Sequence, residues 1–287
     1  MQGRPCSLVA SFALPAQAAN PVWEPPSPCG PRLQPLMPRV CPRAQVCGLI
    51  EVHMPEPLHR SLFVPGPAGR LESLLWSVAE NPNGTVPLAA IVCHPHPLFG
   101  GTMHNKVVYQ TAKTLHRFGL PVLRFNFRGV GASEGSHDKG LGEREDVSAA
   151  LDFLSGAYPG APLLVAGFSF GSWVGLRVGC ADARVTHLIG LGLPVSDLVG
   201  DRGFSYLDAC AKPKLLAAGE FDQYGPPHQL NALVEQFPPQ SKQQTSVAVI
   251  RGADHFFTGH LAGLDSAIAN WLVARQLNLG ASGARMA

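Results

Sequence analysis

The chain of 287 residues is long enough to bury the core of one α/β domain or of two small domains. Hydrophobic residues make up 46% of it and charged residues only 15%, so we expect a packed, soluble, globular protein. The 22 basic and 20 acidic residues nearly cancel, which argues against nucleic acid or an anionic membrane as the main partner, and no apolar run reaches the roughly 20 residues that span a bilayer.

The first 53 residues differ in composition from the rest, with ten prolines and four of the seven cysteines. Because residues before proline avoid the helical region, we predict that 1–53 is a disordered extension and that 54–287 is the folded domain. Two alternatives stay open for the extension. Residues 1–18 have features of an export signal that ends at a small-residue cleavage site, and Cys41, Cys47 and His53 are possible zinc ligands, although their spacing matches no familiar zinc motif.

From residue 58 onward, short apolar runs alternate with segments of helical period, which predicts a mostly parallel sheet with helices on both faces. The first two runs have no helix between them and are expected to form an antiparallel hairpin at the sheet edge. The predicted strands lie at 61–64, 71–80, 87–93, 121–127, 162–168, 185–193, 212–220 and 245–252. The predicted helices lie at 105–119, 142–157, 171–181, 226–237 and 261–277.

The pattern G-x-S-x-G occurs twice, around Ser133 and around Ser169. Ser169 follows the apolar run PLLVAGF and precedes a helical segment, and a serine on a sharp strand-to-helix turn is the context of a catalytic nucleophile. Ser133 lies instead in the polar, glycine-rich loop RGVGASEGSHDKG. We therefore predict that Ser169 is the nucleophile and that Ser133 is an ordinary loop residue.

A serine nucleophile requires a histidine base that is oriented by a carboxylate, and in this topology the chain order is Ser, Asp or Glu, then His. Asp222 follows the seventh predicted strand and His255 follows the eighth. Glu220 and His260 are the respective rivals. Asp222 is preferred because Glu220 lies closer to the strand, and His255 because His260 falls at the start of the last helix.

The oxyanion that forms during acyl transfer needs two N–H donors, commonly from the residue after the nucleophile and from the loop after the third strand. The first donor is then Phe170. In the loop CHPHPLFGGTMHN, Pro95 and Pro97 lack an N–H, which leaves Leu98 or His96 as the second donor, and Leu98 is preferred. No metal site is predicted, because His94 and His96 have no carboxylate near them in sequence.

Three long motifs, HPHPLFGGTMHNKVV, LRFNFRGVGASEGSHDKGLGERED and GFSFGS, resemble those of the α/β-hydrolase superfamily, and more narrowly a family of small bacterial hydrolases related to dienelactone hydrolases. The similarity covers about residues 58–277. It implies an eight-stranded serine hydrolase of carboxylic esters that uses no cofactor. One difference is that dienelactone hydrolases carry cysteine where this chain has Ser169, which makes dienelactone a poor substrate candidate.

Only residues 194–211 separate the sixth and seventh predicted strands, which is too short for the helical cap of many superfamily members. We therefore expect no cap domain and an open, shallow site that takes small or exposed ester substrates. The arginines and acidic residues Arg124, Arg128, Glu143 and Asp146 are expected to pair structurally, although Arg128 is also a possible ligand for a substrate carboxylate. A serine peptidase, a thioesterase and an inactive binding protein stay open as alternatives, and the odd number of cysteines favours the cytoplasm over export.

Overall fold

The computed structural model describes residues 59–78, 86–196 and 203–277. The predictions for the extension at 1–53, including the export signal and the zinc ligands, lie outside these residues. Among the described residues, no helix has both the length and the apolar character needed to cross a membrane.

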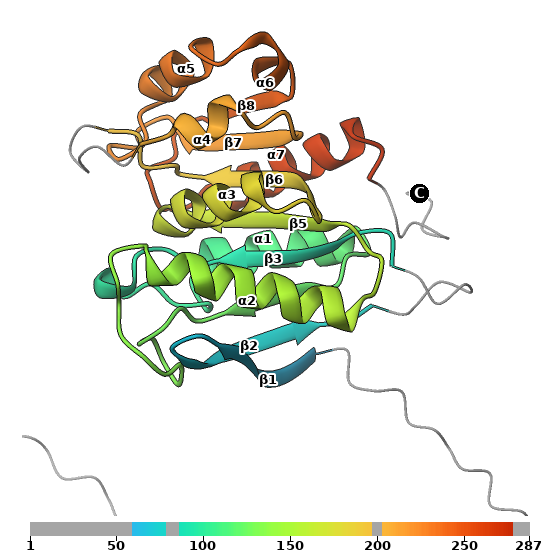
Figure 1. Ribbon diagram of the computed structural model, residues 1–287. Coiled ribbons are helices and arrows are strands. Elements are labelled where there is room, and N and C mark those ends of the chain that lie inside the picture. Colours follow the sequence, from blue (N-terminus) through green and yellow to red (C-terminus); the bar gives the residue numbers. More distant parts are fainter. Residues whose placement is uncertain (1–58, 79–85, 197–202, 278–287) are drawn as a thin grey trace, which may run out of the picture. The chain divides into compact units, whose positions relative to one another are not determined.

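The sheet has eight strands in the order β1-β2-β4-β3-β5-β6-β7-β8, which confirms the predicted eight-stranded α/β fold (Figure 1). β1 (His59–Gly66) and β2 (Gly69–Trp76) form the predicted antiparallel hairpin, and β2 also pairs antiparallel with β4 (Val122–Phe125). The other neighbouring strands pair in parallel. They are β3 (Ala89–Cys93), β5 (Leu163–Phe168), β6 (Val185–Leu191), β7 (Lys214–Gly219) and β8 (Thr245–Ile250).

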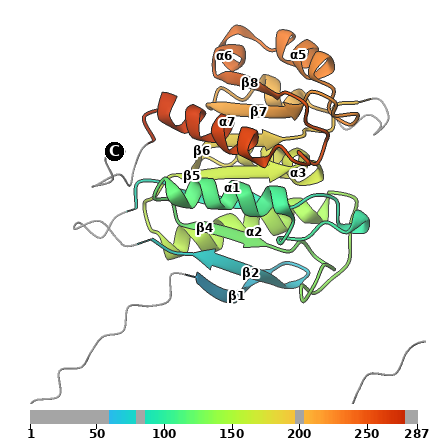
Figure 2. The same ribbon diagram turned by 180° about the vertical axis from the view of Figure 1, so that it is seen from behind.

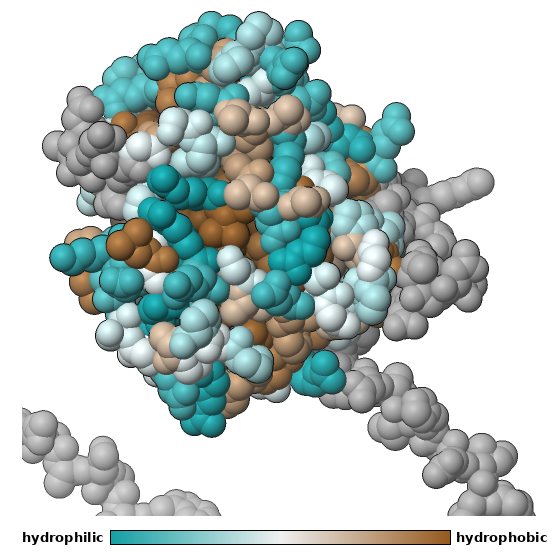
Figure 3. All heavy atoms as spheres, viewed as in Figure 1, coloured by the Kyte–Doolittle hydropathy of each residue, from teal (hydrophilic) through white to brown (hydrophobic). Residues whose placement is uncertain are grey.

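Helices cover both faces of the sheet. α2 (Gly142–Ala157) and α3 (Phe170–Ala181) pack on one face, and α1 (Lys106–Arg117) and α7 (Leu261–Ala274) pack on the other (Figures 1 and 2). Every residue of β3, β5 and β7 is buried, because each of these central strands is covered on both sides. The outer surface over α2 and α3 is mostly polar, with apolar residues showing in its middle (Figure 3).

Four helical elements complete the described chain. α5 (Pro227–Glu235) agrees with a predicted helix, but no sequence pattern indicates the short elements η1 (Pro97–Phe99), α4 (Ser205–Asp208) and α6 (Pro239–Gln243). These last three have three to five residues, which is too few for a periodic pattern. In the described part of the segment between β6 and β7, α4 is the only helix, and no cap domain is present there.

Candidate active site

Ser169 occupies a strained turn between β5 and α3, with φ 53° and ψ −119°. The two glycines of its motif allow this turn because the backbone comes into close contact there. A Cβ atom at Gly167 would lie 2.3 Å from the carbonyl oxygen of Gly171, and one at Gly171 would lie 2.4 Å from the carbonyl oxygen of His94. The same contacts hold the start of α3 against the end of β3, so the side chain of Ser169 projects at the carboxyl edge of the sheet.

His255 and Asp222 meet Ser169 at this edge, from the loops that follow β8 and β7. Nε2 of His255 lies 3.0 Å from Oγ of Ser169, and Nδ1 of His255 lies 2.8 Å from Oδ1 of Asp222. His255 and Asp222 are buried, which shields their contact from water, whereas the contact between His255 and Ser169 is part-buried beside a cavity. The three residues separated widely in sequence therefore form a continuous chain of hydrogen bonds.

The carboxylate of Asp222 is fixed by its own loop. Oδ1 accepts hydrogen bonds from the backbone N–H groups of Tyr224, at 2.9 Å, and of Gly225, at 2.8 Å, in addition to the contact with His255. The imidazole of His255 packs against the rings of Phe168 and Tyr224, with centroids 5.2 Å and 4.8 Å away. With Nδ1–H donating to Asp222, Nε2 is the nitrogen left to accept a proton from Ser169.

The rival residues lie in other structural contacts. Ser133 Oγ donates to the carbonyl of Asn126 at 2.7 Å and accepts from the N–H of Glu72 at 2.9 Å, so this serine joins the loop after β4 to β2. Glu220 accepts a hydrogen bond from the N–H of Gly252, and Nδ1 of His260 lies 2.8 Å from the carbonyl of Thr258. None of these contacts includes a residue of the Ser169, His255 and Asp222 cluster.

The loop after β3 differs from the preferred prediction in the position of Leu98. The N–H of Leu98 donates to Nδ1 of His96 at 3.2 Å, and the side chain of Leu98 is 69% exposed, outside the cavity. The N–H of Leu98 is therefore already used within its own loop, which disagrees with its predicted role as the second donor, whereas His96, the alternative that the sequence left open, lines the cavity beside Ser169. The N–H of Phe170 is the first of α3, where first-turn N–H groups have no acceptor inside the helix.

A cavity of about 460 Å³ opens beside Ser169. It is formed by loops at the carboxyl ends of the strands, which is where α/β sheets bind their ligands. The lining residues are Pro95, His96, Phe99, Gly100, Gly101, Asn105, Ser169, Phe170, Pro194, Tyr224, His255 and Phe256. Tyr224 and Phe256 were not predicted to line the site, although each lies within two residues of a predicted site residue.

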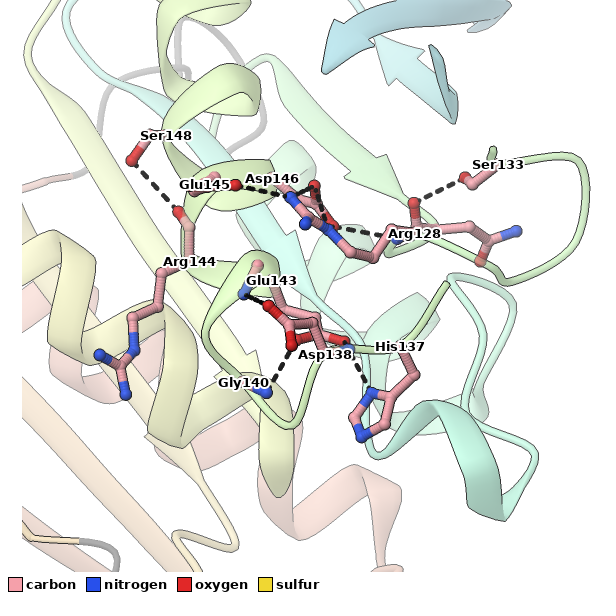
Figure 4. A network of polar contacts seen from close by, with 12 residues as sticks. Arg128, Ser133, His137, Asp138, Gly140, Glu143, Arg144, Glu145, Asp146 and Ser148 are labelled. Carbon is pink, nitrogen blue, oxygen red and sulfur yellow. Dashed lines mark hydrogen bonds and ion pairs between the residues drawn. The ribbon is translucent and has the colours of Figure 1, made fainter. Parts of the chain in front are cut away.

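Residues 128–148 form a polar network beside the site (Figure 4). Nε and Nη2 of Arg128 donate to the carboxylate of Asp146, and Nη2 also reaches Glu145. The buried carboxylate of Glu143 accepts from the N–H groups of Asp138 and Gly140 and lies 2.6 Å from Nδ1 of His137.

The predicted structural pairing of Arg128 with the acidic helix is thus present. Arg124 is also buried, but it does not pair with that helix. It donates to the carbonyl of Met103 at 2.9 Å and lies over the ring of Trp76.

His94 has a structural position. It is fully buried, its Nδ1 lies 2.6 Å from the carbonyl of Pro95, and its Nε2 accepts from the N–H of Phe127 at 2.9 Å. Burial lowers its pKa to about 4, so the imidazole is neutral at pH 7. Within the described ranges, no group of three or more His, Cys, Asp or Glu side chains is arranged to hold a metal ion.

Comparison with known proteins agrees with this geometry. A family model described as an alpha/beta hydrolase domain matches residues 92–267. The chain belongs to the α/β-hydrolase family. An uncharacterised protein of Rickettsia prowazekii (strain Madrid E) is 37% identical over 219 residues, which cover 76% of this hydrolase chain and 90% of the relative.

Two solved structures resemble this α/β-hydrolase in both sequence and fold. One is an alpha-beta serine hydrolase homologue from Coxiella burnetii, 36% identical with a TM-score of 0.66, covering 74% of this chain and 96% of the other. The second, from Xanthomonas campestris, is a member of the α/β serine hydrolases without a lid, 33% identical with a TM-score of 0.67, covering 78% of this chain and 97% of the other. The superfamily resemblance is confirmed, and the narrower relation to dienelactone hydrolases stays a prediction.

Proposed function

We propose that this α/β-hydrolase is a serine hydrolase that cleaves carboxylic ester bonds through Ser169, His255 and Asp222. The observation that carries the proposal is the continuous hydrogen-bonded chain of 3.0 Å and 2.8 Å contacts beside the cavity. These distances are within the range required of a nucleophile, its base and the group that orients the base.

In the proposed mechanism, Nε2 of His255 takes the proton of Ser169 as Oγ attacks the ester carbonyl. Asp222 stabilises the resulting imidazolium, and the N–H groups of Phe170 and His96 donate to the oxyanion. The imidazolium then protonates the departing alcohol as the C–O bond breaks, which leaves an acyl group on Ser169. A water molecule, deprotonated by His255, attacks the acyl carbonyl, and the acid departs as the proton returns to Ser169.

Fluorophosphonate labelling with peptide mapping tests the assignment of the nucleophile, together with hydrolysis of a series of p-nitrophenyl esters. The label is expected on Ser169, and Ser169→Ala is expected to abolish both labelling and turnover. Ser133→Ala is the matched control, because Ser133 lies in the second G-x-S-x-G motif and its hydroxyl has only structural contacts. A label on another residue, or turnover by Ser169→Ala at the wild-type rate, would contradict the proposal.

The same hydrolysis assay distinguishes oxygen esters from the alternative substrates, thioesters and peptides. Thioesters and peptides of matched acyl chains are expected to react more slowly than the corresponding oxygen esters. An inactive binding protein is expected to give neither label nor turnover.

The proposal also covers the extension at residues 1–53 and the cellular compartment of the protein. We take residues 1–53 to be dispensable for catalysis, so a chain that starts at Met54 is expected to fold and to keep ester hydrolysis. We place the protein in the cytoplasm, because Cys93, Cys180 and Cys210 are free thiols and the seven cysteines of the chain are an odd number. Loss of activity on truncation, or recovery of the protein in an exported fraction, would contradict these two points.

A further inference from the structure

The cavity beside Ser169 is lined by rings and lacks formal charge. None of its lining residues is Asp, Glu, Lys or Arg. Half of them carry an aromatic ring, namely His96, Phe99, Phe170, Tyr224, His255 and Phe256. A charged group that entered this cavity would lose hydration and find no opposite charge in the lining, which is unfavourable.

The rings form two walls, one on each side of the nucleophile. The sheet order places β3 on one side of β5 and β6, β7 and β8 on the other, and Ser169 follows β5. On the β3 side, the ring of His96 packs against those of Phe99 and Phe170, with centroids 4.7 Å and 4.8 Å away.

On the other side, Tyr224 and Phe256 pack against His255 at 4.8 Å and 5.2 Å. A group on either half of an ester held at Ser169 therefore meets aromatic side chains.

Several of these rings are exposed and are not packed in the protein core. Phe99 is 85% exposed, Phe256 45% and Tyr224 36%, although all three line the cavity. Burial of apolar area stabilises a complex, so a ligand that covers these rings gains from each of them. Edge-to-face and offset-stacked geometries favour an aromatic ligand over a saturated one of similar size.

The two buried arginines near the site, Arg128 and Arg124, already contact other groups. The guanidinium of Arg128 has 8% side-chain exposure and pairs with Asp146 and Glu145. Arg124 is buried and donates to the carbonyl of Met103. Neither arginine lines the cavity, so neither is placed to bind a substrate carboxylate.

We propose that the cavity selects esters that carry an uncharged aromatic group in the acid or the alcohol half. This inference rests on the proposed ester hydrolysis and narrows its substrate class. The volume agrees with it, since a cavity of about 150 Å³ holds benzene and this one measures about 460 Å³. One ring, the ester group and a short linker fit together in that space.

Two pairs of esters test the selection, with acid release followed by pH-stat so that no aromatic reporter group is present. Ethyl phenylpropanoate is compared with ethyl cyclohexylpropanoate for the acid half, and benzyl acetate with cyclohexylmethyl acetate for the alcohol half. In each pair the ring is separated from the reacting carbonyl, so the intrinsic reactivities are similar. We expect kcat/KM to favour the aromatic member of at least one pair by about tenfold.

Substitutions in the two walls test whether their rings cause the preference for aromatic esters. Phe99→Leu and Phe256→Leu are each expected to reduce the aromatic preference by about threefold or more, because each removes one ring contact. Phe63→Leu is the matched control. Phe63 lies on the edge strand β1, is 45% exposed and is not part of the cavity lining, so its loss should leave the ratio unchanged. The ratio of kcat/KM for the two esters of a pair is compared, because any disturbance of His255 affects both esters and cancels in the ratio.

A binding measurement separates failure of this inference from failure of the proposed function. Ser169→Ala protein is titrated with phenylpropanamide and cyclohexylpropanamide by calorimetry, and tighter binding of the aromatic amide is expected. If the aromatic amide binds more tightly but the wild type hydrolyses no ester, the cavity inference is supported and the proposed hydrolysis is contradicted. Turnover with equal kcat/KM within both ester pairs overturns the inference and leaves hydrolysis standing. A carboxylate added to the aromatic ring should lower kcat/KM, and undiminished turnover of that anionic ester also overturns the inference.

Discussion

Replacement of Asp222 by asparagine tests how the carboxylate acts on His255. Two backbone N–H groups, from Tyr224 and Gly225, donate to the same oxygen that contacts His255. An asparagine NH₂ in that position would face two donors, so the amide is expected to place its oxygen there and its nitrogen at the position of Oδ2. The N–H of His255 then still meets an acceptor, and the productive tautomer is retained. What the substitution removes is the negative charge.

The size of the loss follows from that difference. A hydrogen bond to a charged group contributes about 1.5–3 kcal/mol and one between neutral groups about 0.5–1.5 kcal/mol. The imidazolium of the transition state is therefore expected to lose about 1–1.5 kcal/mol of stabilisation, which corresponds to a fall in kcat of about 5- to 13-fold. Loss of the correct tautomer would be larger, about 10⁴-fold, as in the serine protease triad.

The assay is steady-state hydrolysis of a p-nitrophenyl ester by the wild type, Asp222→Asn and Asp222→Ala. Asp222→Ala is expected to be the more impaired variant, because it leaves the N–H groups of Tyr224 and Gly225 and the ring of His255 without their acceptor. Wild-type kcat in Asp222→Asn would show that the carboxylate does not act on the reaction. A loss as large as that of Ser169→Ala would show that the amide oxygen is not held as argued.

Three further predictions concern stability and are checked by urea denaturation. Ser169→Gly is expected to be more stable than Ser169→Ala by about 1 kcal/mol, because φ of 53° strains any residue with a Cβ; equal stability would refute this. Ser133→Ala should lose about 1–3 kcal/mol of stability while it keeps the active-site label, because two buried hydrogen bonds disappear; unchanged stability would count against the structural role. His94 has a folded pKa of about 4, below its unfolded value of about 6.5, so the unfolded chain binds more protons and stability should fall by about 3 kcal/mol as the pH drops from 6.5 to 4. His94→Gln should show a smaller fall over that range, and an identical pH profile would contradict the assignment.

The fold was predictable because the strand signals were strong. β3, β5 and β7 are buried on both faces and appear in the sequence as continuous apolar runs, each followed by a helical pattern or a polar loop. The hairpin was predictable from the absence of a helix between its two strands. The helices α4 and α6 were not, because elements of four and five residues are formed by tertiary contacts and leave no period in the sequence.

The positions of the site residues were predictable to different degrees. Ser169, Asp222 and His255 each follow a recognisable strand, and parallel strands bring their carboxyl ends to one edge, so the sequence order was sufficient to group them. The choice between Leu98 and His96 depended on how the loop turns. η1 directs the N–H of Leu98 back to the His96 side chain, and a contact two residues apart within an irregular loop has no sequence pattern.

The walls of the cavity were beyond sequence reasoning for a similar reason. Phe99, Tyr224 and Phe256 come from three loops that follow different strands, and each alone resembles an ordinary exposed aromatic residue. Only the sheet order shows that these loops surround the same serine.

The measurement that tests the central claim most directly is rapid acid quenching during ester turnover, followed by intact-mass and peptide analysis. With an ester whose activated alcohol leaves faster than the acyl-enzyme is hydrolysed, such as a p-nitrophenyl ester, the account predicts a covalently bound acyl group that is attached to Ser169 and forms no slower than product is released. Turnover of such an ester with the acyl group on a different residue, or with an acyl group on Ser169 that forms more slowly than product is released, would contradict a mechanism that passes through Ser169.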